Sequence, residues 1–117
     1  MTDYLLLFRN ASAANGYLAS SDDMAKDMPL WQAWMGQMAQ QGKLVHTAPV
    51  SYEAAVLNSN GTQAHAPYKE SNSVLVSGYV LCRADSMEEV TAWGHTCPIL
   101  KYPHSTVEIR PLLPFQV

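Results

Sequence analysis

Continuous apolar runs in this chain alternate with segments in which apolar and polar positions follow a regular period. Residues 4–9, YLLLFR, lack polar alternation, which is typical of a strand covered on both faces. Residues 73–84, SVLVSGYVLCRA, read as a second strand, with Leu75 and Tyr79 expected on one face and Val76 among the small residues of the other. We predict that the first strand is central and that the small face of the second accepts a helix.

A helical period follows the first strand, over residues 20–42. Ser20 or Ser21 is the expected N-cap, aspartates follow where the helix dipole is positive, and Gly42 is expected to end the helix. Pro29 lies inside the pattern and removes a main-chain hydrogen bond, so a kink or a restart is expected there. The apolar stripe predicted to face a sheet comprises Met24, Met28, Trp31, Met35, Met38 and Ala39.

The middle of the chain has a weaker strand pattern. Residues 44–57 predict an irregular strand broken near Pro49. Asn60 and Gly61 form the pair favoured in a type I′ hairpin turn, so a further short strand is expected at residues 62–65.

The last third predicts a helix and a final strand. Ser86 and Glu89 have the spacing of a capping box, and Pro98 is expected to end the helix that follows. Residues 105–113, STVEIRPLL, supply the last strand. One face of the helix is predicted to carry Met87, Val90, Trp93 and Cys97. The order β-α-β-β-α-β, with both helices on one side, predicts an α+β fold, a ferredoxin-like sandwich with an antiparallel sheet.

Composition narrows the class of protein. With 117 residues, 48% of them hydrophobic, the chain predicts a single domain over residues 1–117. Ten acidic residues against seven basic ones, without a charge run, argue against nucleic acid and anionic membranes as partners. The apolar run between Asp3 and Arg9 is shorter than a signal-peptide core or a membrane span. We therefore expect a cytoplasmic protein.

Cysteine and histidine give no metal-site pattern. Cys82 and Cys97 lack CxxC spacing, and in a reducing compartment they are expected to be small buried hydrophobes without a disulfide. The spacings of His65, His95 and His104 follow no recognised zinc motif. We expect neither a metal ion nor a cofactor.

A single helix layer leaves one face of the sheet uncovered, although the strands carry large apolar residues on both faces. A second copy packing sheet to sheet would cover that face. The sequence therefore predicts a homodimer.

The order of motifs resembles the YCII-related proteins of the DGPF type. The resemblance is carried by YLLLFR, MPLWQAWMGQMAQQGKLVHTAPV, HAPYKES, SGYVLCRADSMEEVTAWGHTCP and VEIRPL. The Asp-Gly-Pro-Phe tetrapeptide of the family falls on His65, Ala66, Pro67 and Tyr68, where only the proline is identical, and Glu70 matches a glutamate two places later. These differences describe a divergent member.

The resemblance implies a dimeric α+β barrel. Members of the DGPF type look like companions of extracytoplasmic-function sigma factors, and some broader relatives are lyase-like enzymes acting on chlorinated aromatics. Proteins of related fold bind flat aromatic or polyketide molecules beside the sheet, which is an analogy of fold.

Two residues are candidates for catalysis. His65 and Glu70 could form a general-base pair, in which a carboxylate orients an imidazole. The alternative is a polar loop with a structural role. Candidate ligand-binding residues are Tyr68, Trp31, Trp34, Tyr79, Arg9 and Arg83.

The leading functional hypothesis is a dimer that binds a small apolar or aromatic ligand or a protein partner. The first alternative is a cofactor-independent lyase or isomerase with His65 as base. The second is a regulatory companion of a sigma factor, which depends on the resemblance alone.

Overall fold

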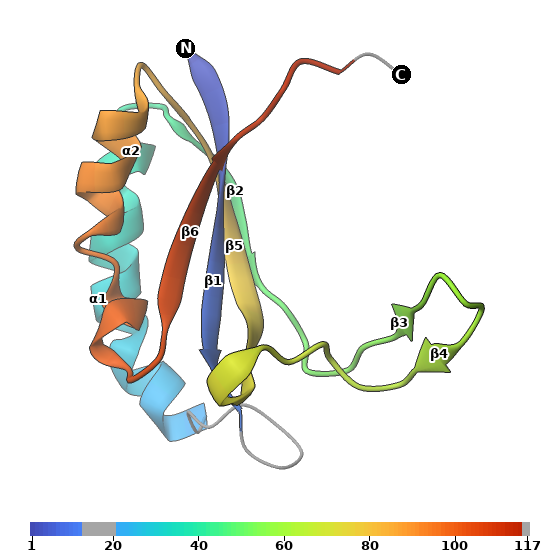
Figure 1. Cartoon of the computed structure of the whole chain (residues 1–117). Coiled ribbons are helices and arrows are strands. Elements are labelled where there is room, and N and C mark those ends of the chain that lie inside the picture. Colours follow the sequence, from blue (N-terminus) through green and yellow to red (C-terminus); the bar gives the residue numbers. More distant parts are fainter. Residues whose placement is uncertain (13–20, 116–117) are drawn as a thin grey trace.

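The computed structural model describes residues 1–12 and 21–115. It shows an α+β fold in which two α-helices cover one face of a four-stranded antiparallel sheet (Figure 1). The sheet order is β2-β5-β1-β6, so the first strand is central, as predicted. The elements are β1 Thr2–Ala11, α1 Ser21–Ala39, β2 Leu44–Pro49, β3 Val56–Leu57, β4 Gln63–Ala64, β5 Val74–Ala84, α2 Met87–Gly94 and β6 Thr106–Pro111, with 3-10 turns η1 Ser71–Ser73 and η2 Pro98–Lys101.

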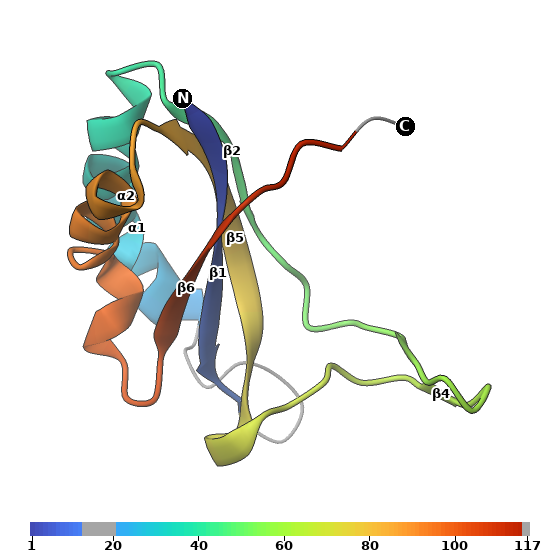
Figure 2. The same cartoon turned by 45° about the horizontal axis from the view of Figure 1, so that its top comes forward.

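The hydrophobic core lies between the helices and the sheet. Leu6 and Val80 have no exposed surface, because alternate residues of a strand face the helix layer. Val90 of α2 is buried against them from the helix side. The other face of the sheet is not covered by a described element (Figure 2). The order of the elements is consistent with the predicted ferredoxin-like arrangement.

A tryptophan pair joins the two helices. The rings of Trp34 and Trp93 stack with centroids 3.9 Å apart and planes within 4°. The indole N–H of Trp34 donates to the carbonyl of Trp93 at 2.8 Å, and the indole N–H of Trp93 donates to the carbonyl of Trp34 at 2.9 Å. These contacts attach the C-terminal half of α1 to α2.

Helix α1 runs without interruption through Pro29, so the predicted restart is wrong. Its first turns lean away from the line of the remaining helix in Figure 1, as expected for a proline-induced kink. The helix begins at Ser21, and the alternative cap Ser20 lies outside the described residues. Gly42 follows the helix with a φ of 69° and, with hydrogen bonds from Lys43 N to Met38 O and from Gly42 N to Ala39 O, forms a Schellman motif.

A bulge in β5 corrects the predicted faces of this strand. Phe8 pairs with Gly78, but Arg9 pairs with Val76, so Ser77 is an extra residue. The bulge reverses the alternation upstream. By register, Val76 therefore shares the open face with Tyr79, and Leu75, opposite Asn10, lies on the helix side, contrary to the prediction.

The β3–β4 hairpin extends away from the main sheet (Figure 2). Asn58 N–H donates to Thr62 O and Gly61 N–H donates to Asn58 O. The connection is therefore a three-residue loop with Gly61 at a φ of 87°, and the type I′ prediction is wrong. A type I′ turn needs positive φ at both central residues, and Asn60 does not have it.

The serine half of the predicted capping box of α2 is confirmed, and the glutamate reaches back one residue beyond the N-cap. The hydroxyl of Ser86 accepts from Glu89 N–H, while the Glu89 carboxylate accepts from Asp85 N–H. The helix ends at Gly94, before Pro98, and Met87 is substantially exposed instead of buried. In the described part of the chain, no helix is long and apolar enough to cross a membrane.

Candidate functional site

A cavity of about 540 Å³ lies between α1 and the helix-side face of the sheet. Most of the residues that line it, among those the structure describes, are apolar. The walls come from α1, β1, β2, the bulge of β5 and η2. The lining residues are Phe8, Asn10, Met24, Asp27, Met28, Trp31, Gln32, Met35, Gly36, Ala39, Thr47, Ala48, Pro49, Val50, Ser77, Gly78, Ile99 and Tyr102.

The large side chains of α1 differ in how deeply they are buried. Trp34 and Met38, in the second half, are each only 2% exposed, whereas Met24 and Met28 are 48% and 51% exposed. Of the predicted stripe, Met38 packs in the core, whereas Met24, Met28, Trp31, Met35 and Ala39 line the cavity. The ring of Trp31 lies 5.3 Å from that of Phe8.

Glycines shape two walls of the cavity. A side chain at Gly78 would meet the carbonyl oxygen of Ala48 at 3.2 Å, so β2 and β5 approach closely there. On the helix side, a Cβ built on Gly36 meets no other atom within 4 Å. The cavity wall at Gly36 is therefore open.

One end of the cavity is polar. Asp27 of α1 is 4% exposed, and its two carboxylate oxygens accept hydrogen bonds from Lys101 Nζ and from the hydroxyl of Tyr102. These hydrogen bonds, with that from Lys101 the strongest, lower the pKa of Asp27 below its ordinary value. Among the described lining residues, Asp27 is the only one with a charged side chain.

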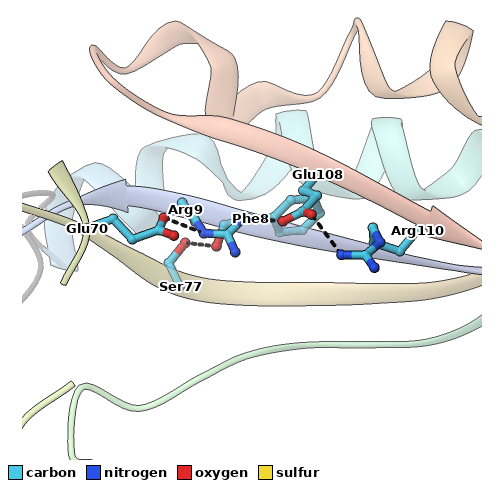
Figure 3. Close-up of polar contacts among 6 residues, drawn as sticks. All are labelled: Phe8, Arg9, Glu70, Ser77, Glu108 and Arg110. Carbon is cyan, nitrogen blue, oxygen red and sulfur yellow. Dashed lines mark hydrogen bonds and ion pairs between the residues drawn. The ribbon is translucent and has the colours of Figure 1, made fainter. Parts of the chain in front are cut away.

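A second hollow, of about 330 Å³, lies where the arm joins the sheet, the arm being residues 50–70 with the β3–β4 hairpin at its tip. Arg9 lines it and bonds to Glu70 at 2.9 Å and to Glu108 at 2.7 Å, while Arg110 bonds to Glu108 at 3.2 Å (Figure 3). The two arginines, Arg9 foremost, lower the pKa of Glu108. At the nearby bulge, the hydroxyl of Ser77 donates to the carbonyl of Phe8.

The candidate catalytic residues lie in different surroundings. His65 is exposed in the arm, directly after β4. Glu70 bonds to Arg9 at the base of the arm. The described contacts include none between His65 and Glu70, so the structure does not bring this pair together.

The predicted ligand-binding residues are spread over three regions. Trp31 lines the cavity, and Trp34 lies beside it in the core, with ring centroids 5.7 Å apart. Tyr79 bonds to His46 at 2.6 Å, on the open face of the sheet. Arg83 pairs with Asp3 on that face as well. Tyr68 and Arg9 lie beside the smaller hollow.

Sequence reasoning missed Asp27, Lys101 and Tyr102. Asp27 precedes Trp31 by four positions and Trp34 by seven, so an acidic residue lies on the apolar stripe of the helix. This position was the only available signal. Its partners are 74 and 75 residues away, and no local pattern in the sequence indicates that contact.

The cysteines are free and buried, as expected. Burial raises the pKa of Cys82 to about 11 and that of Cys97 to about 12, which disfavours the reactive thiolate at neutral pH. Within residues 1–12 and 21–115, no group of three His, Cys, Asp or Glu side chains is placed to hold a metal ion.

No protein-family model matches this chain, and no curated protein matches it. The resemblance to the YCII-related proteins therefore remains a prediction from the motifs.

Proposed function

We propose that this protein binds a small, largely apolar ligand between α1 and the sheet. The cavity beside Trp31 is the observation that carries the proposal. Its volume of about 540 Å³ exceeds the lower end of ligand pockets, about 300 Å³. Aromatic and methionine side chains on the wall suit an apolar molecule, because thioethers adapt to its shape.

Calorimetric titration with 2-methoxynaphthalene tests this proposal. We expect saturable binding with a negative heat-capacity change, because apolar surface is buried. Quenching of tryptophan fluorescence, lost in a Trp31→Leu variant, would locate the probe in the cavity. Absence of saturable binding for any naphthalene probe would overturn the proposal.

We further propose a ferredoxin-like protomer that forms a homodimer of the dimeric α+β barrel type. On the open face of the sheet, Leu5 and Leu7 of β1 lie opposite Arg110 and Glu108 of β6, and Leu81 and Tyr79 of β5. A mixed face of this kind, apolar at its centre with charged residues beside it, suits a protein interface.

The arm and the C-terminal segment also support a dimer. Both extend on the side of the sheet opposite the helices (Figure 1). They carry large exposed side chains, among them Leu57 at 76% and Phe115 at 85% exposure. The radius of gyration is 15.4 Å, against roughly 13 Å for a compact chain of this length. A partner copy would cover these segments.

Sedimentation equilibrium tests the dimer. We expect the wild-type protein to sediment as a dimer and a Leu7→Arg variant to shift toward monomer, because a charged side chain would have to lose its hydration at the apolar centre of the interface. Met87→Arg, on the helix side of the protomer, is the matched control and should remain dimeric. A wild-type monomer at high concentration would contradict the proposal.

No specific observation on the described residues favours the lyase or the sigma-factor alternative. A base pair of His65 and Glu70 needs the two side chains in contact, whereas Glu70 bonds to Arg9. Ligand binding is therefore the function that the contacts of the described residues support best.

A further inference from the structure

The polar end of the cavity retains hydrogen-bonding capacity. An ionised carboxylate offers about four acceptor positions, and Asp27 receives one hydrogen bond from Lys101 and one from Tyr102. Because the carboxylate lines the cavity and is nearly withdrawn from bulk water, a ligand that donates a hydrogen bond can use the remaining capacity. A ligand without a donor cannot.

The charges at this end favour a neutral ligand. The negative charge of Asp27 is balanced by Lys101 in a direct ion pair. The other described lining residues are uncharged. An anionic ligand would face the carboxylate, and a cationic ligand would compete with Lys101, so each would bring an unbalanced charge into an apolar site.

The walls favour a flat ring. Phe8 and Trp31 present aromatic surfaces at a 58° angle, and Met24, Met28 and Met35 line the helix side. Aromatic and thioether groups make favourable contacts with the faces and edges of a ring. On the sheet side of the cavity, the missing side chain of Gly78 lets β2 and β5 lie close together.

The geometry points to a neutral aromatic compound bearing a hydroxyl group, held by its ring between α1 and the sheet and by its hydroxyl donating to the carboxylate of Asp27. This inference rests on the proposed ligand-binding function and adds the chemical class of the ligand and its anchoring residue. Asp27 is thereby a binding residue, with Lys101 and Tyr102 positioning its carboxylate.

A pair of probes tests the inference in the full wild-type chain. 2-Naphthol and 2-methoxynaphthalene share a ring and an oxygen, but only 2-naphthol donates a hydrogen bond. We expect 2-naphthol to bind at least about tenfold more tightly, because hydrogen bonds to charged groups are stronger than those between neutral groups. 2-Naphthoate, the anionic probe, is expected to bind more weakly than 2-naphthol.

Two aspartate variants locate the anchor. Asp27→Asn keeps the shape of the side chain and removes its charge, and should reduce the preference for 2-naphthol over 2-methoxynaphthalene to less than about threefold. Asp85→Asn makes the same chemical change at an exposed position outside the cavity and should retain the full preference. Circular dichroism establishes that both variants fold.

The outcomes separate the two proposals. Equal binding of 2-naphthol and 2-methoxynaphthalene to the wild-type protein overturns the hydroxyl anchor and leaves the apolar pocket standing. Tighter binding of 2-naphthoate than of 2-naphthol would assign the polar end to an anion and overturn the neutral class. If no probe binds, the proposed function fails, and the anchor fails with it.

Discussion

Replacing Gly36 with leucine should fill the cavity and stabilise the protein at the same time. Gly36 lies within α1, and a Cβ built there meets no neighbour within 4 Å. Leucine is favoured over glycine in a helix by roughly 0.5–1 kcal/mol. The free energy of unfolding should rise by about this amount, which corresponds to an increase of roughly 2–5 °C in Tm.

The same substitution should weaken ligand binding. Gly36 lines the cavity, so the leucine side chain would occupy space that the ligand needs. We expect the Kd for 2-methoxynaphthalene to rise by at least about tenfold, or about 1.4 kcal/mol. Calorimetric titration measures the affinity, and urea unfolding followed by circular dichroism measures the stability.

Gly36→Ala is the matched control, because it makes nearly the same change in helix propensity and adds only a methyl group to the wall. It should stabilise the protein while reducing affinity by less than about threefold, since a single added methyl removes little of the cavity volume. A leucine variant that unfolds more easily than wild type would show that the wall is packed. One that binds the probe as wild type does would show that the ligand lies elsewhere.

Three further sets of substitutions test the packing, the polar end and the sheet. Trp34→Phe and Trp93→Phe should each lower the free energy of unfolding by roughly 2–4 kcal/mol. The double variant should lose at least about 0.5 kcal/mol less than the sum of the two single losses, because both residues form one stacked pair. Losses that add in urea unfolding would refute this coupling. The pKa of Asp27 is lower in the folded chain than its ordinary value of 3.8, so its stabilising effect is present above that value and is lost as pH falls through the folded pKa. Acid unfolding should therefore be shallower in Asp27→Asn than in wild type, and an unchanged pH profile would contradict the role of the ion pair. Gly78→Val should lower the free energy of unfolding by about 2 kcal/mol or more, because its side chain would collide with the backbone of β2. A thermal unfolding midpoint equal to that of the wild-type protein would show that β2 and β5 can move apart without cost.

The sequence predicted the main elements where a long period was present. The continuous apolar run of β1 and the alternation of β5 identified the two central strands, and the spacing of Ser86 and Glu89 located the start of α2. Those patterns are local, so they can be recognised without knowledge of tertiary contacts. The bulge at Ser77 was not predictable in this way, because it shows only in the pairing with Phe8 and Arg9.

The candidate site was less accessible to sequence reasoning. Trp31, which the sequence offers as a candidate ligand-binding residue, lines the cavity, whereas Trp34 lies in the core. Whether a methionine on the same stripe packs or lines a space depends on how far the helix stands from the sheet. The contact of Asp27 with Lys101 and Tyr102 joins segments more than 70 residues apart, and only the folded chain shows it.

The two attachments of α1 explain why its cavity can persist without a ligand. The stacked pair of Trp34 and Trp93 holds the second half of the helix, and the bonds from Lys101 and Tyr102 to Asp27 hold the first half to η2. A helix held at both places cannot collapse onto the sheet between them without breaking one attachment. The pocket is therefore preformed, which reduces the ordering cost of binding. A ligand that selects this folded state should stabilise it by about 2.7 kcal/mol at a hundredfold excess over its Kd, and weakening the attachment at Asp27 should reduce that gain.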